Sequence, residues 1–143
     1  MSKGITWLAA VAIGTTSVPN DAAAADWRVL ISGTSGSVVF VDVGSLRELP
    51  AIPIQRPFPV RQLWVKIDFS EDKSVTYREI VQKFYFNCSA ETGMSASQTI
   101  YNANGGIVRS SSQRDYDFRY EPETPDSIGY ALMEFACGRR SVP

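Results

Sequence analysis

The chain has 143 residues, and its 14 lysines and arginines nearly balance its 15 aspartates and glutamates, which leaves a formal net charge of −1. Such a charge gives no electrostatic footprint for nucleic acid or for an anionic membrane surface. The chain contains no histidine. This excludes a histidine-activated serine or cysteine nucleophile, and a zinc site with histidine ligands, within this chain.

Residues 1–25 have the pattern of a secretory signal peptide. Lys3 gives a basic start, residues 5–13 form a short apolar run, and alanines at 22–25 provide the small residues needed for cleavage. We expect cleavage after Ala25, which leaves residues 26–143 as one exported domain, in the periplasm, secreted or at the cell surface. No cysteine stands in or just after this segment, so we expect no lipid anchor. No later apolar run approaches the roughly 20 residues of a membrane span.

Alternation of apolar and polar residues predicts six strands in the mature chain. They are expected at 27–31, 38–43, 62–69, 76–88, 93–101 and 107–111. In the first strand, Trp27, Val29 and Ile31 are expected to share one face. The Gly-Thr-Ser-Gly turn at 33–36 predicts a hairpin, and so does Asn104-Gly105, because these residues adopt positive φ readily.

The stretch from Leu49 to Pro59 contains four prolines. Proline cannot donate a backbone hydrogen bond to a sheet, so this stretch is predicted to be an extended surface loop. We favour a structural spacer for it, with a recognition segment as the alternative. A second loop is expected over 114–121, which is charged and aromatic.

The C-terminal part of the chain predicts one helix. Thr124 is expected as its N-cap, with Pro125 at the first helical position, and Gly138 is expected to end it. An apolar stripe with helical spacing runs through Ile128, Ala131, Leu132, Phe135 and Ala136. Cys137 shares a second apolar side with Tyr130 and Met133, so the helix is either deeply buried, covered by a partner, or loosened in its last turn.

Two cysteines, Cys88 and Cys137, occur in this exported chain. Because exported compartments are oxidising, we expect one disulfide rather than a catalytic thiol or a metal pair. Such a bond would hold the helix on the sheet face that carries Ile80, Phe84 and Phe86. The expected fold is therefore α+β and mostly β, a six-stranded antiparallel sheet with one C-terminal helix packed on one face.

An ordered series of residues resembles the surface-adhesin protein E family over about residues 26–138. The series is Trp27, Val41-Asp42, Trp64-Val65-Lys66, Cys88, Tyr101 with Gly105-Gly106, and Cys137. The resemblance implies the same six-stranded sheet with a disulfide-tied C-terminal helix. It also implies a non-enzymatic, adhesin-like domain for host extracellular-matrix or serum proteins, with a homodimer as a further form.

The residues themselves suggest no catalytic, cofactor-binding or metal site, and we expect no cofactor. Four carboxylates, at Asp42, Asp68, Glu71 and Asp72, stand at expected strand ends or turns. Two of them could in principle form an acid–base pair, but no other feature of the sequence points to such catalysis. Asp115 and Asp117 are too sparse for a calcium loop.

A more informative group lies on the sheet face opposite Cys88. If the third and fourth strands pair, this face carries Trp64, Lys66, Val81, Lys83 and Tyr85. Aromatic and cationic residues on an open sheet suggest a patch for a protein partner, acidic in character, or for a second copy of the chain. The alternative is that these side chains are simply half-exposed or covered by loops. A periplasmic accessory domain and an enzyme or small-ligand carrier remain as other function classes.

Overall fold

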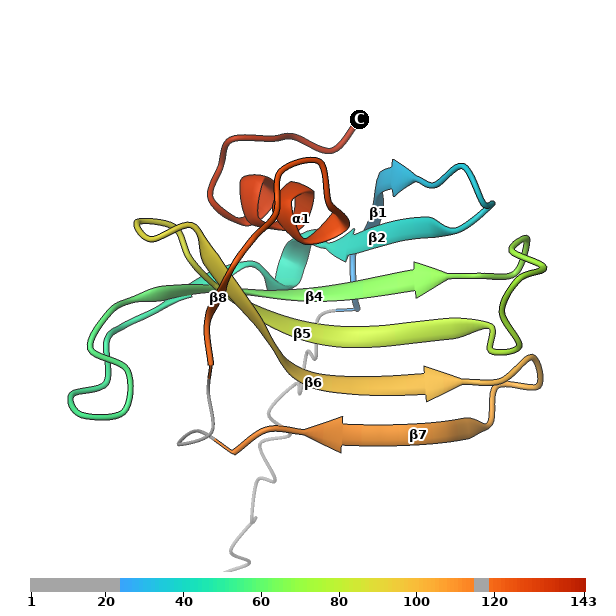
Figure 1. Cartoon of the computed structure of the whole chain (residues 1–143), viewed down its shortest axis with the longest axis horizontal. Helices are drawn as coiled ribbons and strands as arrows, with labels where there is room; N and C mark the ends of the chain where they lie inside the picture. Colours follow the sequence, from blue (N-terminus) through green and yellow to red (C-terminus); the bar gives the residue numbers. More distant parts are fainter. Residues whose placement is uncertain (1–23, 115–118) are drawn as a thin grey trace, which may run out of the picture.

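The computed structural model describes residues 24–114 and 119–143, so the expected signal peptide up to residue 23 lies outside the described residues. In this part of the chain one antiparallel sheet is covered on one face by one helix (Figure 1). Six strands follow one another across the sheet: β1 (Trp27–Ser32), β2 (Val38–Asp42), β4 (Val60–Asp68), β5 (Glu79–Asn87), β6 (Thr92–Tyr101) and β7 (Ile107–Ser112). The predicted fold class is confirmed.

Two further short strands extend the sheet. β3 (Arg47–Leu49) pairs with β4, and β8 (Glu121–Pro122) pairs with β6. The alternation pattern missed both because two or three residues are too few to show a period. β8 occupies the end of the loop expected over 114–121, and residues 115–118 of that loop lie outside the described residues.

The expectation that Trp27, Val29 and Ile31 share one face is wrong. The pairing of β1 with β2 shifts register between Val29 and Ile31, as a β-bulge does. The bulge turns Leu30 and Ile31 toward the hydrophobic core, while Trp27 stays on the opposite face beside Lys66.

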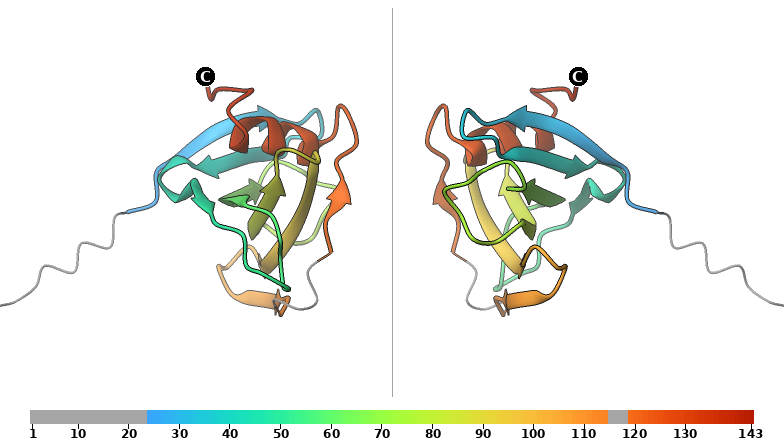
Figure 2. Two further views of the ribbon diagram at one scale, coloured as in Figure 1. Left: turned by 90° about the vertical axis from the view of Figure 1, so that its left-hand side faces the viewer. Right: turned by 90° about the vertical axis from the view of Figure 1, so that its right-hand side faces the viewer.

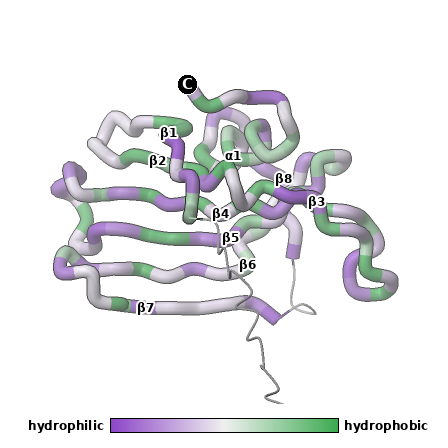
Figure 3. The backbone as a smooth tube through the Cα atoms, turned by 180° about the vertical axis from the view of Figure 1, so that it is seen from behind, coloured by the Kyte–Doolittle hydropathy of each residue, from purple (hydrophilic) through white to green (hydrophobic). Residues whose placement is uncertain are grey.

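Strands β4 and β5 follow the predicted alternation of core-facing and outward-facing residues, and Figure 3 shows hydrophobic and hydrophilic residues interspersed along them. Leu63 and Val65 of β4 are fully buried on the side toward the helix. Ile67 and Phe84 are partly buried against the same core. This period of two is the reason why one face of the sheet can form a core while the other meets solvent.

The helix α1 (Ile128–Ala136) begins later than predicted. Its N-cap is Ser127, whose hydroxyl oxygen accepts a hydrogen bond from the Tyr130 N–H at 3.0 Å. Asp126 has φ of 62°, outside the helical region, so the helical path cannot run on from Thr124 and starts only after this residue. Ile128, at the first turn, is 43% exposed and does not belong to the buried stripe.

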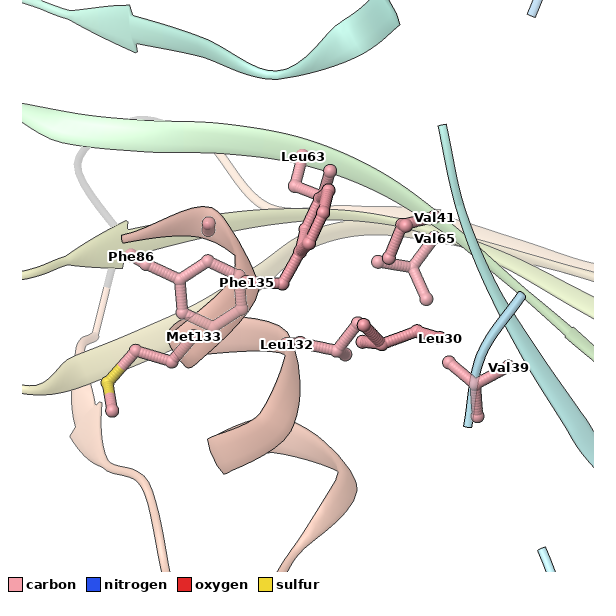
Figure 4. Packing of buried hydrophobic residues seen from close by; sticks show 10 residues of the cluster. Leu30, Val39, Val41, Leu63, Val65, Phe86, Leu132, Met133 and Phe135 are labelled. Atoms are coloured by element: carbon pink, nitrogen blue, oxygen red, sulfur yellow. The ribbon is translucent and has the colours of Figure 1, made fainter. Parts of the chain in front are cut away.

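Both apolar sides of α1 are buried. Of the three alternatives considered for this helix (deep burial, cover by a partner, or a loosened last turn), the structure shows deep burial. Met133 is fully buried together with the predicted stripe residue Leu132. Figure 4 shows these side chains meeting the sheet residues. The core cluster consists of Leu30, Val39, Val41, Leu63, Val65, Phe86, Leu132, Met133, Phe135 and Ala136.

The predicted disulfide is present and joins Cys88, just after β5, to Cys137 at the helix C-cap, with 5.7 Å between the Cα atoms. Arg139 reinforces this junction, since its guanidinium donates to the Cys88 carbonyl oxygen at 3.2 Å and pairs with the Glu91 carboxylate. Figure 2 shows from the side that the helix lies on one face of the curved sheet. A covalent bond therefore holds the only helical cover of this core, among the described residues, in place.

Replacing both cysteines, Cys88→Ala with Cys137→Ala, should lower the free energy of unfolding by about 2–5 kcal/mol, because the unfolded chain regains the entropy of an open loop. Urea unfolding measures this difference. A reductant should destabilise the wild-type protein and leave the double variant unchanged. A loss below about 1 kcal/mol would mean that packing alone holds the helix.

Candidate binding face

The face of the sheet turned away from α1, called here the outer face, brings the predicted residues together. In the register of β4 with β5, Trp64 lies opposite Lys83 and Lys66 lies opposite Val81. Tyr85 lies opposite Gln62 on the same face. The alternation of each strand thus places all five predicted side chains on one surface, where each is partly exposed.

Two lysines of the outer face are held over aromatic rings. The Lys66 ammonium lies 4.9 Å from the ring centroids of both Trp27 and Phe40. The Lys83 ammonium lies 5.5 Å from the Trp64 ring and 5.9 Å from the Tyr85 ring. Distances under about 6 Å give an attraction of roughly 0.5–1 kcal/mol at exposed sites, so each charge is kept in a defined place. Sequence reasoning missed Trp27 and Phe40, because it did not extend the face across β1 and β2.

The charges on the outer face are not evenly distributed. Within the described part of the chain, no carboxylate forms an ion pair with the ammonium of Lys66 or Lys83. The carboxylates of Asp68 and Glu79 lie opposite each other at one end of β4 and β5. A hydrogen bond from the Ser70 hydroxyl, above all, lowers the pKa of Asp68 and keeps it ionised. The centre of the face is therefore cationic and aromatic, with an acidic end.

Ser45 fixes the backbone at Trp64. Along β4, residues from Val60 to Gln62 pair with β3 and residues from Val65 to Asp68 pair with β2, so the Trp64 N–H faces the gap between these partners. The Ser45 hydroxyl oxygen fills that gap and accepts this N–H at 2.9 Å. The same hydroxyl donates to the Asp42 carbonyl oxygen at 2.7 Å. Sequence reasoning could not find this role, because nothing in the pattern indicates where β4 changes partners.

A cleft of about 280 Å³ opens beside Trp64. Its polar walls include Arg47, whose guanidinium donates to the Gln62 side-chain oxygen at 3.3 Å. The lining residues are Ala24, Asp42, Gly44, Ser45, Arg47, Gln62 and Trp64. The cleft thus continues the aromatic and cationic surface toward the N-terminal end of the domain.

The proline-rich loop covers one end of the outer face, where sequence analysis expected only an extended surface loop. Arg56 is buried in this loop, and its guanidinium donates to the Pro50 carbonyl oxygen at 2.8 Å and to the Phe58 carbonyl oxygen at 3.3 Å. The Phe58 ring meets the edge of Tyr120 with 5.1 Å between centroids. Tyr120 in turn lies close enough to Tyr85 to interact with it electrostatically, so the alternative that loops cover the face applies at this end.

The described residues contain no group of three or more Cys, Asp or Glu side chains that could hold a metal ion. Asp115 and Asp117, considered above for calcium, lie outside them. Nor is any helix within the same ranges long and apolar enough to cross a membrane.

Comparison with protein families gives a match to the model of surface-adhesin protein E over residues 27–138. The chain belongs to the surface-adhesin protein E family. Comparison with curated proteins gives no match, and comparison with solved structures gives none either. The match runs from the start of β1 to the glycine that follows the disulfide, so it includes the whole outer face and the helix that covers the other face.

Membership of this adhesin family supports an adhesin-like surface protein with a protein or other host ligand. It favours binding over catalysis, and it favours an exported or cell-surface location, consistent with the expected signal peptide.

The pKa of the Tyr120 hydroxyl depends on how closely the proline-rich loop covers this part of the domain. Its hydroxyl is buried without a hydrogen-bond partner among the described residues. Burial raises the pKa of Tyr120 to about 12, while the nearby Arg56 guanidinium lowers it slightly and Tyr85 raises it. Because the folded-state pKa lies above the unfolded value near 10, folding loses stability as the pH rises above about 10.

In an ultraviolet titration, one tyrosine should ionise about two pH units later than exposed tyrosines. Phe58→Ala should open the site and move that late transition toward pH 10, because the Tyr120 hydroxyl regains water. Phe69→Ala is the matched control, since it removes a similar edge contact from Tyr77. A late transition that Phe58→Ala leaves in place would show that the loop does not shield Tyr120.

Proposed function

We propose that this protein is a non-enzymatic adhesin-like module whose outer face binds an acidic segment of a host extracellular-matrix or serum protein. The observation that carries the proposal is the pair of ammonium groups, on Lys66 and Lys83, each held between aromatic rings and without an ion-pair partner among the described residues. A partner carboxylate placed on them would supply the missing counter-charge.

The arrangement suits binding because little has to be ordered on association. Trp64 offers a large contact area with only two side-chain torsions, and the lysine chains already rest on rings. Fixing a free lysine costs up to roughly 2 kcal/mol of side-chain entropy, and part of that cost is met when the domain folds. The lysines would act mainly on association rate and specificity, while the rings supply most of the contact energy.

The charge of the outer face favours a different protein over a second copy of this chain. A symmetric dimer through the centre of this face would bring the lysines of both copies together, and like charges across an interface destabilise it. A periplasmic accessory or structural role is the second candidate. It is separated from the first by cell fractionation, since an adhesin must be found at the surface or in the medium.

The double variant Trp64→Ala with Tyr85→Ala should weaken binding to immobilised extracellular-matrix or serum proteins at least about tenfold, or about 1.4 kcal/mol. The thermal midpoint should stay nearly unchanged, because both side chains lie on the face opposite the core. Surface plasmon resonance and thermal unfolding measure the two quantities on the same samples.

Ile128→Ala is the matched control, because it removes an exposed apolar side chain from the helix side and should leave binding intact. If the double variant unfolds, the outer face is part of the core. If it folds and binds like wild type, recognition lies elsewhere, and the proline-rich loop from Leu49 to Pro59 becomes the next candidate.

A further inference from the structure

The backbone of Asp26 is fixed on both sides at the point where cleavage is expected. Its N–H donates to the Asp42 carboxylate at 2.9 Å, and its carbonyl oxygen accepts the Val43 N–H at 3.0 Å. These bonds prolong the pairing of β1 with β2 by one residue beyond Trp27. The hydrogen bonding between β1 and its partner segment therefore includes the residue that would become the new N-terminus.

Cleavage changes the chemistry of this nitrogen. Hydrolysis of the bond between Ala25 and Asp26 consumes one water, and the carboxylate leaves with Ala25 while the amine stays on Asp26. An α-amino group has an ordinary pKa near 7.7–8.0, so the amine takes up a proton at neutral pH. A neutral N–H that already donates to a carboxylate would become an ammonium at the same place.

We propose that export processing creates an ion pair between the α-ammonium of Asp26 and the carboxylate of Asp42, and that this pair seats the N-terminus of the mature domain beside the cleft at Trp64. The proposal goes beyond the binding function and does not depend on it. Ala24, which lines the cleft in the full chain, would leave with the signal peptide, so the cleft in its final form belongs to the processed protein.

The surrounding charges leave Asp42 as the counter-ion. Just before β1, the Asp26 side chain is itself engaged by the guanidinium of Arg28, at 2.8 and 3.3 Å. On β3, Arg47 donates to Gln62, and on β4 the Lys66 ammonium lies over the Trp27 ring. Both are cations and cannot pair with the ammonium.

The proposed ion pair would also steady the segment that positions Trp64. The Asp42 carboxylate accepts the Gly44 N–H at 3.2 Å and so caps the short 3-10 helix η1 (Val43–Ser45). Ser45, the last residue of η1, holds the Trp64 N–H. The Asp42 carboxylate that would bind the α-ammonium is therefore linked to the outer face in two steps. The first is its hydrogen bond from the Gly44 N–H in η1, and the second is the hydrogen bond from the Trp64 N–H to Ser45.

The test uses the exported protein, with its first residue established by N-terminal sequencing, and a second full chain with one threonine inserted between Ala25 and Asp26. The pKa of the α-amino group is measured by nuclear magnetic resonance after ¹³C reductive methylation, which keeps the charge. In the protein that begins at Asp26, this pKa should lie about one unit above the ordinary value, because a carboxylate favours the charged form. The protein with the extra residue should show the ordinary value.

Asp42→Asn should return the raised pKa to the ordinary value, since asparagine can still cap η1 but carries no charge. Asp68→Asn is the matched control and should have no effect, because Asp68 lies at the far end of β4. The proposal is overturned if sequencing of the exported protein shows a different first residue, or if its α-amino pKa equals that of the protein with the inserted threonine. That comparison stands even if Asp42→Asn does not fold. Neither result bears on whether the double variant of Trp64 and Tyr85 loses its partner.

Discussion

The contact between the C-terminal helix and one face of the sheet is the constraint on which the rest of this structure depends. A single sheet of this size cannot exclude water from an apolar face without a second layer. Here the second layer is one helix of nine residues, too short to be stable alone in water. It is held by burial of residues such as Leu132 and Met133 and by the disulfide from Cys137 to Cys88.

Because the helix covers one face, the side chains of the other face stay partly exposed to solvent. Its aromatic side chains are not needed for the core, and they instead support the lysines at positions 66 and 83. The proline-rich loop covers only the end near Tyr120, where buried Arg56 holds it closed.

The periodic patterns of apolar residues predicted most of the strands and the helix. The features that they did not predict depend on local backbone conformation or on single contacts. Long alternating runs such as β4 and β5 identify the strands and the five outer-face residues, because a period of two assigns each side chain to a face. The bulge at Leu30 is invisible to that reasoning, since one extra residue reverses the assignment without any change in composition. The helix start at Ser127 depends on the left-handed conformation of Asp126, which threonine and proline just before it did not reveal. Likewise, Ser45 acts through a contact distant in sequence, since its hydroxyl oxygen accepts the Trp64 N–H.

The central claim is that the outer face is open to solvent in the folded protein while the helix face is closed. Hydroxyl-radical footprinting with mass spectrometry tests it most directly and requires no partner. The account predicts rapid labelling of Trp64 in the folded domain, while Met133, a reactive but fully buried side chain, stays protected until the protein is unfolded. Protection of Trp64 as strong as that of Met133, at protein concentrations where the chain is monomeric, would contradict the account.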